Sequence, residues 1–154
     1  MKAIVFSLLL VMLFAGCKKE SCDYNECAMV APQAEVQMVE TYLASKGILA
    51  MKHCSGMYYR IDQQGSGKAP TACSTVDVAY EGKLTNGVTF DQQTSRTFRL
   101  AELIPAWRNG IPRVNAGGTI YLYVPPSLGY GSMANGPIPA NSVLIFEIDL
   151  LGVH

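Results

Sequence analysis

Apolar and polar residues alternate with a period of two along several short stretches of this 154-residue chain. In the clearest of them, at 75–84, the side chains of Val76, Val78 and Tyr80 alternate with polar or small neighbours. Such alternation is typical of a strand with one buried face. The same pattern predicts further strands at 57–61, 88–91, 97–100, 119–124 and 142–151.

Glycine, proline and asparagine separate these stretches and indicate how the strands are joined. Asn86-Gly87 is the strongest hairpin signal in the chain, so the strands on either side of it are expected to be antiparallel neighbours. The polar stretch at 92–96 is expected to be a loop. The stretch at 127–141 is too rich in glycine and proline for a regular element, and it is expected to be a long loop.

One longer stretch, at 32–46, has the spacing of a helix. Val36, Val39 and Leu43 fall on one face of it. Pro32 suits its first turn, and the glycine that follows suits its end. An apolar stripe this short more often meets its own domain than a second copy of the chain. We therefore expect a monomer, with a dimerisation helix as the alternative.

A second, very short helix is predicted between Pro105 and Gly110. Proline can open it because a first-turn residue needs no N–H, and Gly110 and Pro112 end it almost at once. So short a helix does not hold itself together in water, and packing must hold it. Its largest apolar side chain is Trp107, the single tryptophan of the chain. We expect Trp107 to form the floor of a hollow between this helix and the sheet.

These elements predict one α+β domain of antiparallel strands with a small helix between them. The N-terminal helix and its connector occupy 32–55, and the sheet domain occupies 56–154. Hydrophobic residues make up 49% of the chain and charged residues 16%, which suffices for a buried core. Lys+Arg and Asp+Glu balance at 12 each. Nucleic acid binding is not expected, because it needs a surplus of cations.

Residues 1–16 are interpreted as a signal segment. Lys2 supplies a positive charge, and the apolar run that follows is shorter than the roughly 20 residues that span a bilayer. Residues 13–17 resemble a bacterial lipobox, in which the cysteine is lipidated. We therefore expect a lipoprotein of the bacterial cell envelope that is anchored to the membrane through Cys17. An ordinary signal cleaved nearby is the alternative. The polar stretch at 17–31 is expected to be a flexible tether.

Four cysteines remain once Cys17 is set aside, namely Cys22, Cys27, Cys54 and Cys73. An exported protein can keep disulfides, and four cysteines allow three connectivities. We favour the pairs that close the shortest loops, Cys22–Cys27 and Cys54–Cys73. A four-cysteine zinc site is the rival, although the first two cysteines lack the usual CxxC spacing.

The sequence contains few signs of acid–base, metal or nucleotide chemistry. His53 and His154 have no serine or cysteine partner in a recognisable motif, and Asp91 has no second acid at a comparable place. Separate elements instead supply aromatic side chains, namely Tyr80, Phe90, Phe98, Trp107, Tyr130 and Phe146. Any one of them alone is more often a core residue. Tyr130 departs from that rule, because a loop tyrosine between two glycines is poorly placed for a core.

Five blocks resemble the FKBP-type peptidyl-prolyl cis-trans isomerases in order and spacing: VAYEGKL at 78–84, NGVTFD at 86–91, LIPAW at 103–107, VPPSLGYG at 124–131 and IPANSVLIFEI at 138–148. Five co-linear blocks are far more specific than one short motif. The resemblance implies a curved antiparallel sheet wrapped around a short helix, in agreement with the elements above. It also implies that nine residues line a proline pocket: Tyr80, Phe90, Asp91, Leu103, Ile104, Trp107, Tyr130, Ile138 and Phe146.

The resemblance further implies catalysis by binding alone, with no cofactor and no metal. Trp107 would lie beneath the proline ring, and the Ile104 N–H and the Tyr130 hydroxyl would bond substrate carbonyls. Asp91 would orient polar groups at the rim, and Arg96 is the candidate for the arginine that pairs with it. The expected partners are proline-containing polypeptides, and the expected role is the folding of exported proteins. A module that binds proline segments with little turnover and a structural lipoprotein are the alternatives.

Overall fold

The computed structural model describes residues 22–154, so the predicted signal segment at 1–16 and Cys17 lie outside the described residues. The helices are α1 (Gln33–Lys46) and α2 (Pro105–Gly110). The strands are β1 (Met51–Lys52), β2 (Tyr58–Gln63), β3 (Thr75–Leu84), β4 (Thr89–Arg99), β5 (Gly118–Val124) and β6 (Leu144–Val153). Short 3-10 turns are η1 (Leu100–Glu102), η2 (Ile111–Arg113) and η3 (Pro126–Leu128). Within 22–154, no helix is both long and apolar enough to cross a membrane.

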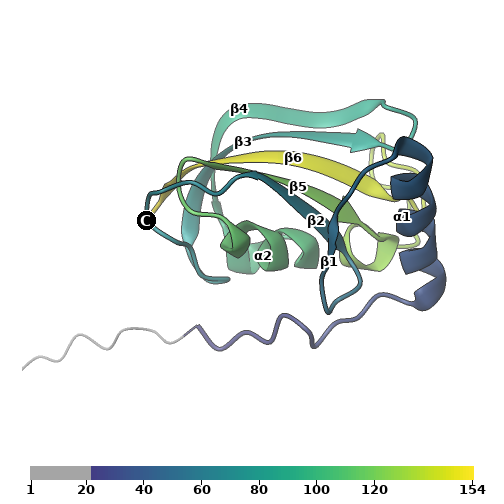
Figure 1. The fold of residues 1–154 in the computed structure, drawn as a ribbon, viewed down its shortest axis with the longest axis horizontal. Helices are drawn as coiled ribbons and strands as arrows, with labels where there is room; N and C mark the ends of the chain where they lie inside the picture. Colours follow the sequence, from purple (N-terminus) through teal and green to yellow (C-terminus); the bar gives the residue numbers. More distant parts are fainter. Residues whose placement is uncertain (1–21) are drawn as a thin grey trace, which may run out of the picture.

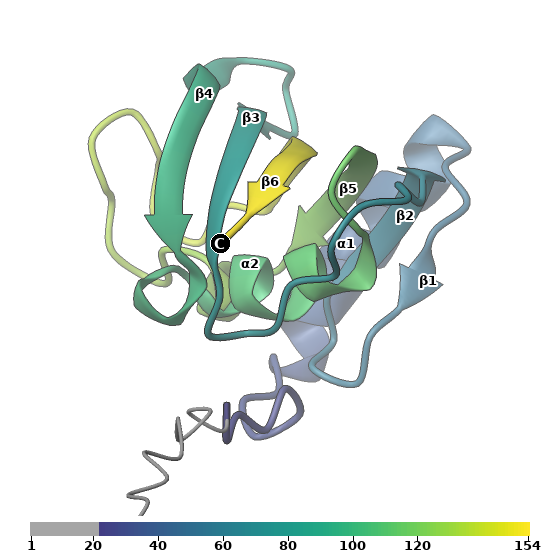
Figure 2. The ribbon, with the colours of Figure 1, turned by 90° about the vertical axis from the view of Figure 1, so that its left-hand side faces the viewer.

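The strands form one antiparallel sheet in the order β1-β2-β5-β6-β3-β4. β6, the last strand in sequence, lies inside the sheet between β5 and β3. The sheet curves around α2, and α1 stands at one end of it (Figures 1 and 2). This is the α+β architecture that the sequence predicts.

The main core lies between α2 and the inner face of the sheet. Alternate residues of β3 and β6 are buried, as are those of β5 as far as Leu122, so the period of two in the sequence corresponds to one covered face. Tyr123 of β5 is buried as well, because α1 covers it on the other face. Gly110 lets α2 approach β5 closely, because a Cβ at this position would lie 2.5 Å from Leu122 Cδ2. The close approach places Trp107, on the same helix, against the inner face.

A second, smaller apolar cluster holds α1. Val39 and Leu43 pack with Tyr123 and Val143 at the edge of the domain. Gly47 ends the helix with a φ of 64°, a left-handed conformation that glycine adopts without steric cost. The prediction that this helix packs on its own domain is confirmed.

Two elements differ from the sequence prediction. Residues 92–96, expected to be a loop, belong to β4. β4 is an edge strand of the sheet and nearly all of its residues are exposed, so polar side chains on both faces hide the period of two. β1 is not predicted, because a strand of two residues is too short to show any period.

Residues 22–31, which we call the N-terminal strap, are attached to the domain, contrary to the flexible tether expected here. Disulfides join Cys22 to Cys73 and Cys27 to Cys54, with Cα–Cα separations of 5.7 and 5.5 Å. The predicted pairing was therefore wrong. The prediction rested only on the separation of the cysteines along the chain. In the structure the strap runs alongside α2 before α1 begins (Figure 1), and this path brings its two cysteines to partners far along the chain.

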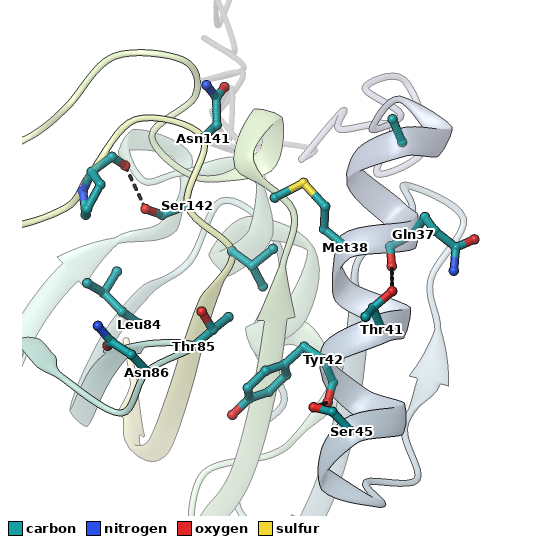
Figure 3. A pocket seen from close by; sticks show the side chains of 13 residues that line it. Gln37, Met38, Thr41, Tyr42, Ser45, Leu84, Thr85, Asn86, Asn141 and Ser142 are labelled. Carbon is teal, nitrogen blue, oxygen red and sulfur yellow. Dashed lines mark hydrogen bonds between the residues drawn. The ribbon is translucent and has the colours of Figure 1, made fainter.

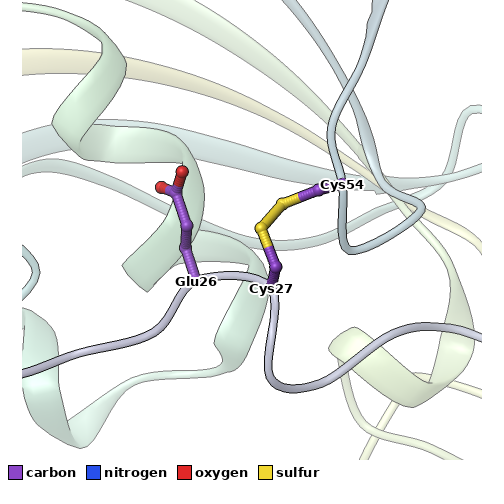
Figure 4. A group of neighbouring side chains, drawn as sticks. All are labelled: Glu26, Cys27 and Cys54. Carbon is purple, nitrogen blue, oxygen red and sulfur yellow. A yellow bond between two sulfur atoms is a disulfide. The ribbon is translucent and has the colours of Figure 1, made fainter.

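The strap also brings Glu26 beside the Cys27–Cys54 disulfide (Figure 4). Because these two sulfur atoms are bonded to each other, they do not offer the thiolates that a four-cysteine zinc site requires. Cys22 and Cys73 are joined in the same way. The zinc alternative is thus contradicted by the pairing itself.

A buried histidine, His53, lies beside the strap and is 5% exposed. Its Nε2 accepts a hydrogen bond of 2.8 Å from the Arg113 guanidinium, which requires a neutral imidazole. Its Nδ1 lies 2.8 Å from Ser55 Oγ. Burial lowers the pKa of His53 and the Arg113 charge lowers it further, while Glu26 acts in the opposite direction.

We expect the free energy of unfolding to fall as the pH drops through about 6.5, the ordinary pKa of histidine. The folded-state pKa of His53 is depressed, so the unfolded chain takes up the proton first and acid favours unfolding. Urea unfolding at about pH 7.5 and about pH 5.5 measures this fall in the free energy of unfolding. In a His53→Gln variant the free energy of unfolding should change much less between the two pH values. An equal loss in both proteins would contradict the assignment to His53.

Candidate active site

A hollow of about 160 Å³ opens between α2, the inner face of the sheet and the loop after η3. Pockets for drug-sized ligands measure roughly 300–1,000 Å³, so this one suits a group the size of a single side chain. Its walls come from five separate stretches of the chain. The lining residues are Tyr80, Asp91, Arg96, Phe98, Leu103, Ile104, Trp107, Tyr130 and Phe146.

Aromatic rings surround Trp107 in the hollow. The ring centroids of Tyr80, Phe98 and Phe146 lie 4.9, 5.7 and 5.4 Å from that of the indole, with interplanar angles of 82°, 89° and 89°. Edge-to-face contacts of this kind are favourable and fix the orientation of the rings. Trp107 Nε1 is buried and has no hydrogen-bond partner within the described chain. The hollow therefore has a closely packed aromatic floor.

The start of α2 leaves one backbone donor free beside this floor. The Ile104 carbonyl accepts hydrogen bonds from the N–H groups of Trp107 and Arg108, at 3.1 and 3.3 Å. The Ile104 N–H itself donates to no acceptor among residues 22–154, and Pro105 has no N–H to offer. Because Ile104 lines the hollow, its N–H is available to a bound ligand.

Two tyrosine hydroxyls lie at the rim. Tyr80 Oη donates to Asp91 Oδ2 at 2.7 Å. Burial raises the pKa of Tyr80 and the bond to Asp91 raises it further, so the hydroxyl stays protonated. Tyr130 is 39% exposed, and its hydroxyl has no partner in the part of the chain described here. Burial and then Asp91 raise the pKa of Tyr130 as well, so it is a free donor at neutral pH.

Arg96 differs from the role that the resemblance implies. Its guanidinium carbon lies 5.1 Å from the centroid of the Phe98 ring, an arrangement that favours cation–π attraction. The Asp91 carboxylate accepts from Tyr80, and no ion pair joins it to Arg96 in the region from 22 to 154. Arg96 thus contributes a positive charge to one wall and leaves Asp91 bonded to tyrosine.

The structure brings together seven of the nine residues predicted for the pocket: Tyr80, Asp91, Leu103, Ile104, Trp107, Tyr130 and Phe146. Phe90 and Ile138 do not line it. Phe90 packs edge-to-face on Phe146, with centroids 5.6 Å apart, and Ile138 is buried in the main core. Phe90 thus supports the wall from behind, and Ile138 belongs to the core.

Arg96 and Phe98 line the hollow but are absent from the predicted set. The signal that would find them is the continuity of β4, because residues two apart on one strand share a face. The expectation of a loop at 92–96 divides β4 in two, so Arg96 and Phe98 are not seen to share a face. Asp91 enters the hollow from the same strand, beyond a register shift in its pairing with β3.

A larger, more open groove lies between α1, the β3–β4 turn and the segment before β6 (Figure 3). Met38 and Tyr42 line it from the helix, Leu84 from the end of β3 and Asn86 from the turn (Figure 3). As far as the described residues extend, no charged side chain lines it. Tyr42 is the single aromatic residue in the described lining of this groove, whereas five aromatic residues line the smaller and more enclosed hollow, so the aromatic hollow is the candidate active site.

Comparison with known proteins gives one family. A family model for FKBP-type peptidyl-prolyl cis-trans isomerases matches residues 66–151. The isomerase FkpA of Aeromonas hydrophila is 36% identical over 123 residues, which cover 75% of this chain and 45% of that protein. The chain thus spans less than half the length of this curated relative.

Solved structures agree with that match. The crystal structure of FkpA from Escherichia coli superposes with a TM-score of 0.69 at 35% identity, over 79% of this chain and 58% of the other. A peptidyl-prolyl cis-trans isomerase from Pseudomonas syringae pv. tomato also gives a TM-score of 0.69, at 30% identity. That alignment covers 80% of this chain and 96% of the other.

Proposed function

The chain belongs to the FKBP-type peptidyl-prolyl cis-trans isomerases, and we propose on that premise that it accelerates rotation about Xaa–Pro bonds in exported polypeptides. The observation that carries the proposal is the small aromatic hollow floored by Trp107. A proline ring matches its size and apolar lining. The donors at Ile104 and Tyr130 line the same hollow and are available to the carbonyls that flank a bound proline, which supports the proposal.

The mechanism follows from the chemistry of the amide bond. Resonance gives rotation a barrier of ~18–20 kcal/mol, so uncatalysed isomerisation takes roughly tens to hundreds of seconds. Resonance also places negative charge on the carbonyl oxygen, and water stabilises this planar form. Rotation breaks the resonance and reduces the charge. A pocket that excludes water therefore binds the twisted form better than the planar form, which lowers the barrier.

Each lining group has a role in this scheme that requires no proton transfer. Trp107 supports the proline ring from below, and Phe146 limits its movement from the side. The Ile104 N–H and the Tyr130 hydroxyl hold the peptide backbone by its carbonyls while the bond between them rotates. Asp91 accepts from Tyr80 and thereby fixes that ring. A general base is not needed, in keeping with the raised pKa of both tyrosines.

A short Xaa–Pro peptide tests the proposal, with a chain of residues 18–154 that keeps all four disulfide cysteines. The natural chain is compared with a Trp107→Ala, Phe146→Ala double variant. Acceleration by the natural chain alone supports an isomerase with its site in the hollow. Saturable quenching of Trp107 fluorescence without acceleration would instead indicate a binding module. If the peptide is neither isomerised nor bound, the proposal is wrong.

Gly82 offers a milder test of the aromatic wall. A Cβ at this position would lie 2.6 Å from Phe90 Cζ and 3.0 Å from Phe146 Cε1, so alanine must displace a ring. We expect Gly82→Ala to lower the free energy of unfolding by about 1–3 kcal/mol and to reduce kcat/KM, because Phe146 lines the hollow. Gly152→Ala is the matched control, with its nearest contact at 3.3 Å. Full activity in Gly82→Ala would contradict the role of this wall.

We further propose that the protein is a monomer exported to the bacterial envelope and anchored by a lipid on Cys17. The signal-like segment at 1–16 supports export, and two disulfides suit an oxidising compartment. Only five residue steps separate Cys17 from the attached Cys22, or roughly 18 Å of extended chain. The anchor would therefore hold the domain close to the membrane. Mass spectrometry of the N-terminal peptide tests for the lipid.

A further inference from the structure

We infer that the N-terminal strap positions α2, and Trp107 with it, and that Tyr24 and Asn109 are the positioning residues. The inference rests on the proposed isomerase function, because it concerns how the floor of that site is held. The strap lies outside the residues that the family model matches. It therefore contacts the matched region, which contains α2, from outside.

α2 depends on its surroundings for stability. It has six residues, which is too short for a helix to persist in water. Ala106, Trp107 and Gly110 are buried, and Gly110 lies against Leu122 of β5. These contacts hold one side of the helix. Arg108 and Asn109, the two residues after Trp107, contact the strap instead of the sheet.

The Asn109 side chain is bonded entirely by the strap. Asn109 is 1% exposed, so its amide lacks water as a partner. Its Oδ1 accepts a hydrogen bond of 2.6 Å from the Tyr24 hydroxyl, and its Nδ2 donates to the Glu26 carbonyl at 3.2 Å. A buried amide is costly unless both of its ends are bonded. The strap thus satisfies both ends of a buried amide on α2, and removing the strap would leave that amide without partners.

The flanking arginines add to the same contact. The Arg108 guanidinium carbon lies 3.8 Å from the centroid of the Tyr24 ring, and Arg108 Nε donates to the Ala72 carbonyl at 3.2 Å. Just beyond α2, the Arg113 guanidinium bonds Glu26 of the strap. The strap therefore contacts α2 through Arg108 and Asn109, and the turn after it through Arg113.

Disulfides fix the strap on both sides of these contacts. Cys22–Cys73 precedes Tyr24, and Cys27–Cys54 follows Glu26. The chain between them has little freedom, so the Tyr24 hydroxyl is held in place for Asn109. A loosened helix would let the indole of Trp107 shift. Small misplacements of a group that contacts the substrate can cost much of its effect on the rate.

Tyr24→Phe tests the inference, because it removes only the hydroxyl and keeps the ring beside Arg108. Its matched control is Tyr58→Phe, which removes a hydroxyl that donates to Glu40 Oε1 and joins β2 to α1, away from the hollow. Two quantities are measured on the disulfide-bonded chain of residues 18–154. One is kcat/KM, and the other is amide hydrogen exchange of Trp107 and Arg108, whose N–H groups bond the Ile104 carbonyl.

We expect Tyr24→Phe to lower kcat/KM roughly 3- to 10-fold and to speed exchange in α2 by at least as much, as the loss of one buried hydrogen bond implies. Tyr58→Phe should leave both quantities unchanged. Equal effects of the two variants, or unchanged α2 exchange in Tyr24→Phe, would overturn the inference. Faster exchange with unaltered kcat/KM would also overturn it. If the natural chain shows no isomerase activity, the proposed function fails, and hydrogen exchange alone decides whether the strap holds α2.

Discussion

Replacing Trp107 by leucine is expected to lower kcat/KM roughly 10- to 100-fold. The indole is in edge-to-face contact with Tyr80, Phe98 and Phe146 and forms the floor on which the proline ring would lie. Each such aromatic contact is worth about 0.5–1.5 kcal/mol, and a tenfold change in rate corresponds to about 1.4 kcal/mol. Leucine keeps the site apolar but removes the flat surface and the contacts that fix it. Steady-state isomerisation of a short Xaa–Pro peptide measures the effect.

A control must show that the lowered kcat/KM of Trp107→Leu comes from the missing floor and not from a general loss of stability. Tyr123→Leu is the matched control, because Tyr123 is 2% exposed in the second cluster and does not line the hollow. Both variants should lose about 2–4 kcal/mol of the free energy of unfolding, as is usual for a large side chain removed from a core. At a temperature where both variants are folded, only Trp107→Leu should have a lowered kcat/KM. A similar loss of activity in both variants would argue against a special role for Trp107.

Reducing the two disulfides is expected to have the largest effect on stability. Cys22–Cys73 and Cys27–Cys54 close loops with sequence separations of 51 and 27 residues. Bridges across loops of this length typically contribute about 2–4 kcal/mol each, mainly by restricting the unfolded chain. Small domains have a total stability of about 5–15 kcal/mol, so loss of both is a large part of the total. Urea unfolding with and without a dithiol reductant measures the difference.

The pairing itself has a direct test. Peptides from the unreduced protein should be linked as Cys22–Cys73 and Cys27–Cys54 in mass spectrometry. A Cys22→Ser, Cys73→Ser double variant should lose about half of the stabilisation that reduction removes. Linked peptides that join Cys22 to Cys27, or an unfolding midpoint that a reductant leaves unchanged, would contradict the structure of the strap.

The parts of the fold that could be predicted are those where one physical rule dominates. β3 shows a clean period of two because one of its faces is covered from Val76 to Gly82. α2 and its tryptophan could be placed because proline and glycine limit the helix so tightly. Most of the pocket residues came from the resemblance to a family. Hydrophobic pattern alone does not distinguish a ring that lines a hollow from one packed behind it.

The parts that could not be predicted depend on contacts between distant residues. Phe90 and Phe146 are both wall aromatics by resemblance, yet Phe146 lines the hollow while Phe90 packs behind it. The cysteine pairing depends on the path of the strap past α2, which local loop lengths do not encode. Asn109 gives the sequence no signal, because its importance lies in partners 83 and 85 residues away.

The most direct test of the central claim is the rate at which the cis and trans forms of an Xaa–Pro peptide interconvert at equilibrium. NMR exchange spectroscopy measures this rate with a catalytic amount of the protein and no coupled reaction. If the aromatic hollow favours the twisted bond, the rate rises in proportion to the amount of natural chain and falls sharply with Trp107→Leu. An unchanged rate in the presence of the natural, disulfide-bonded chain would contradict isomerase activity in this site.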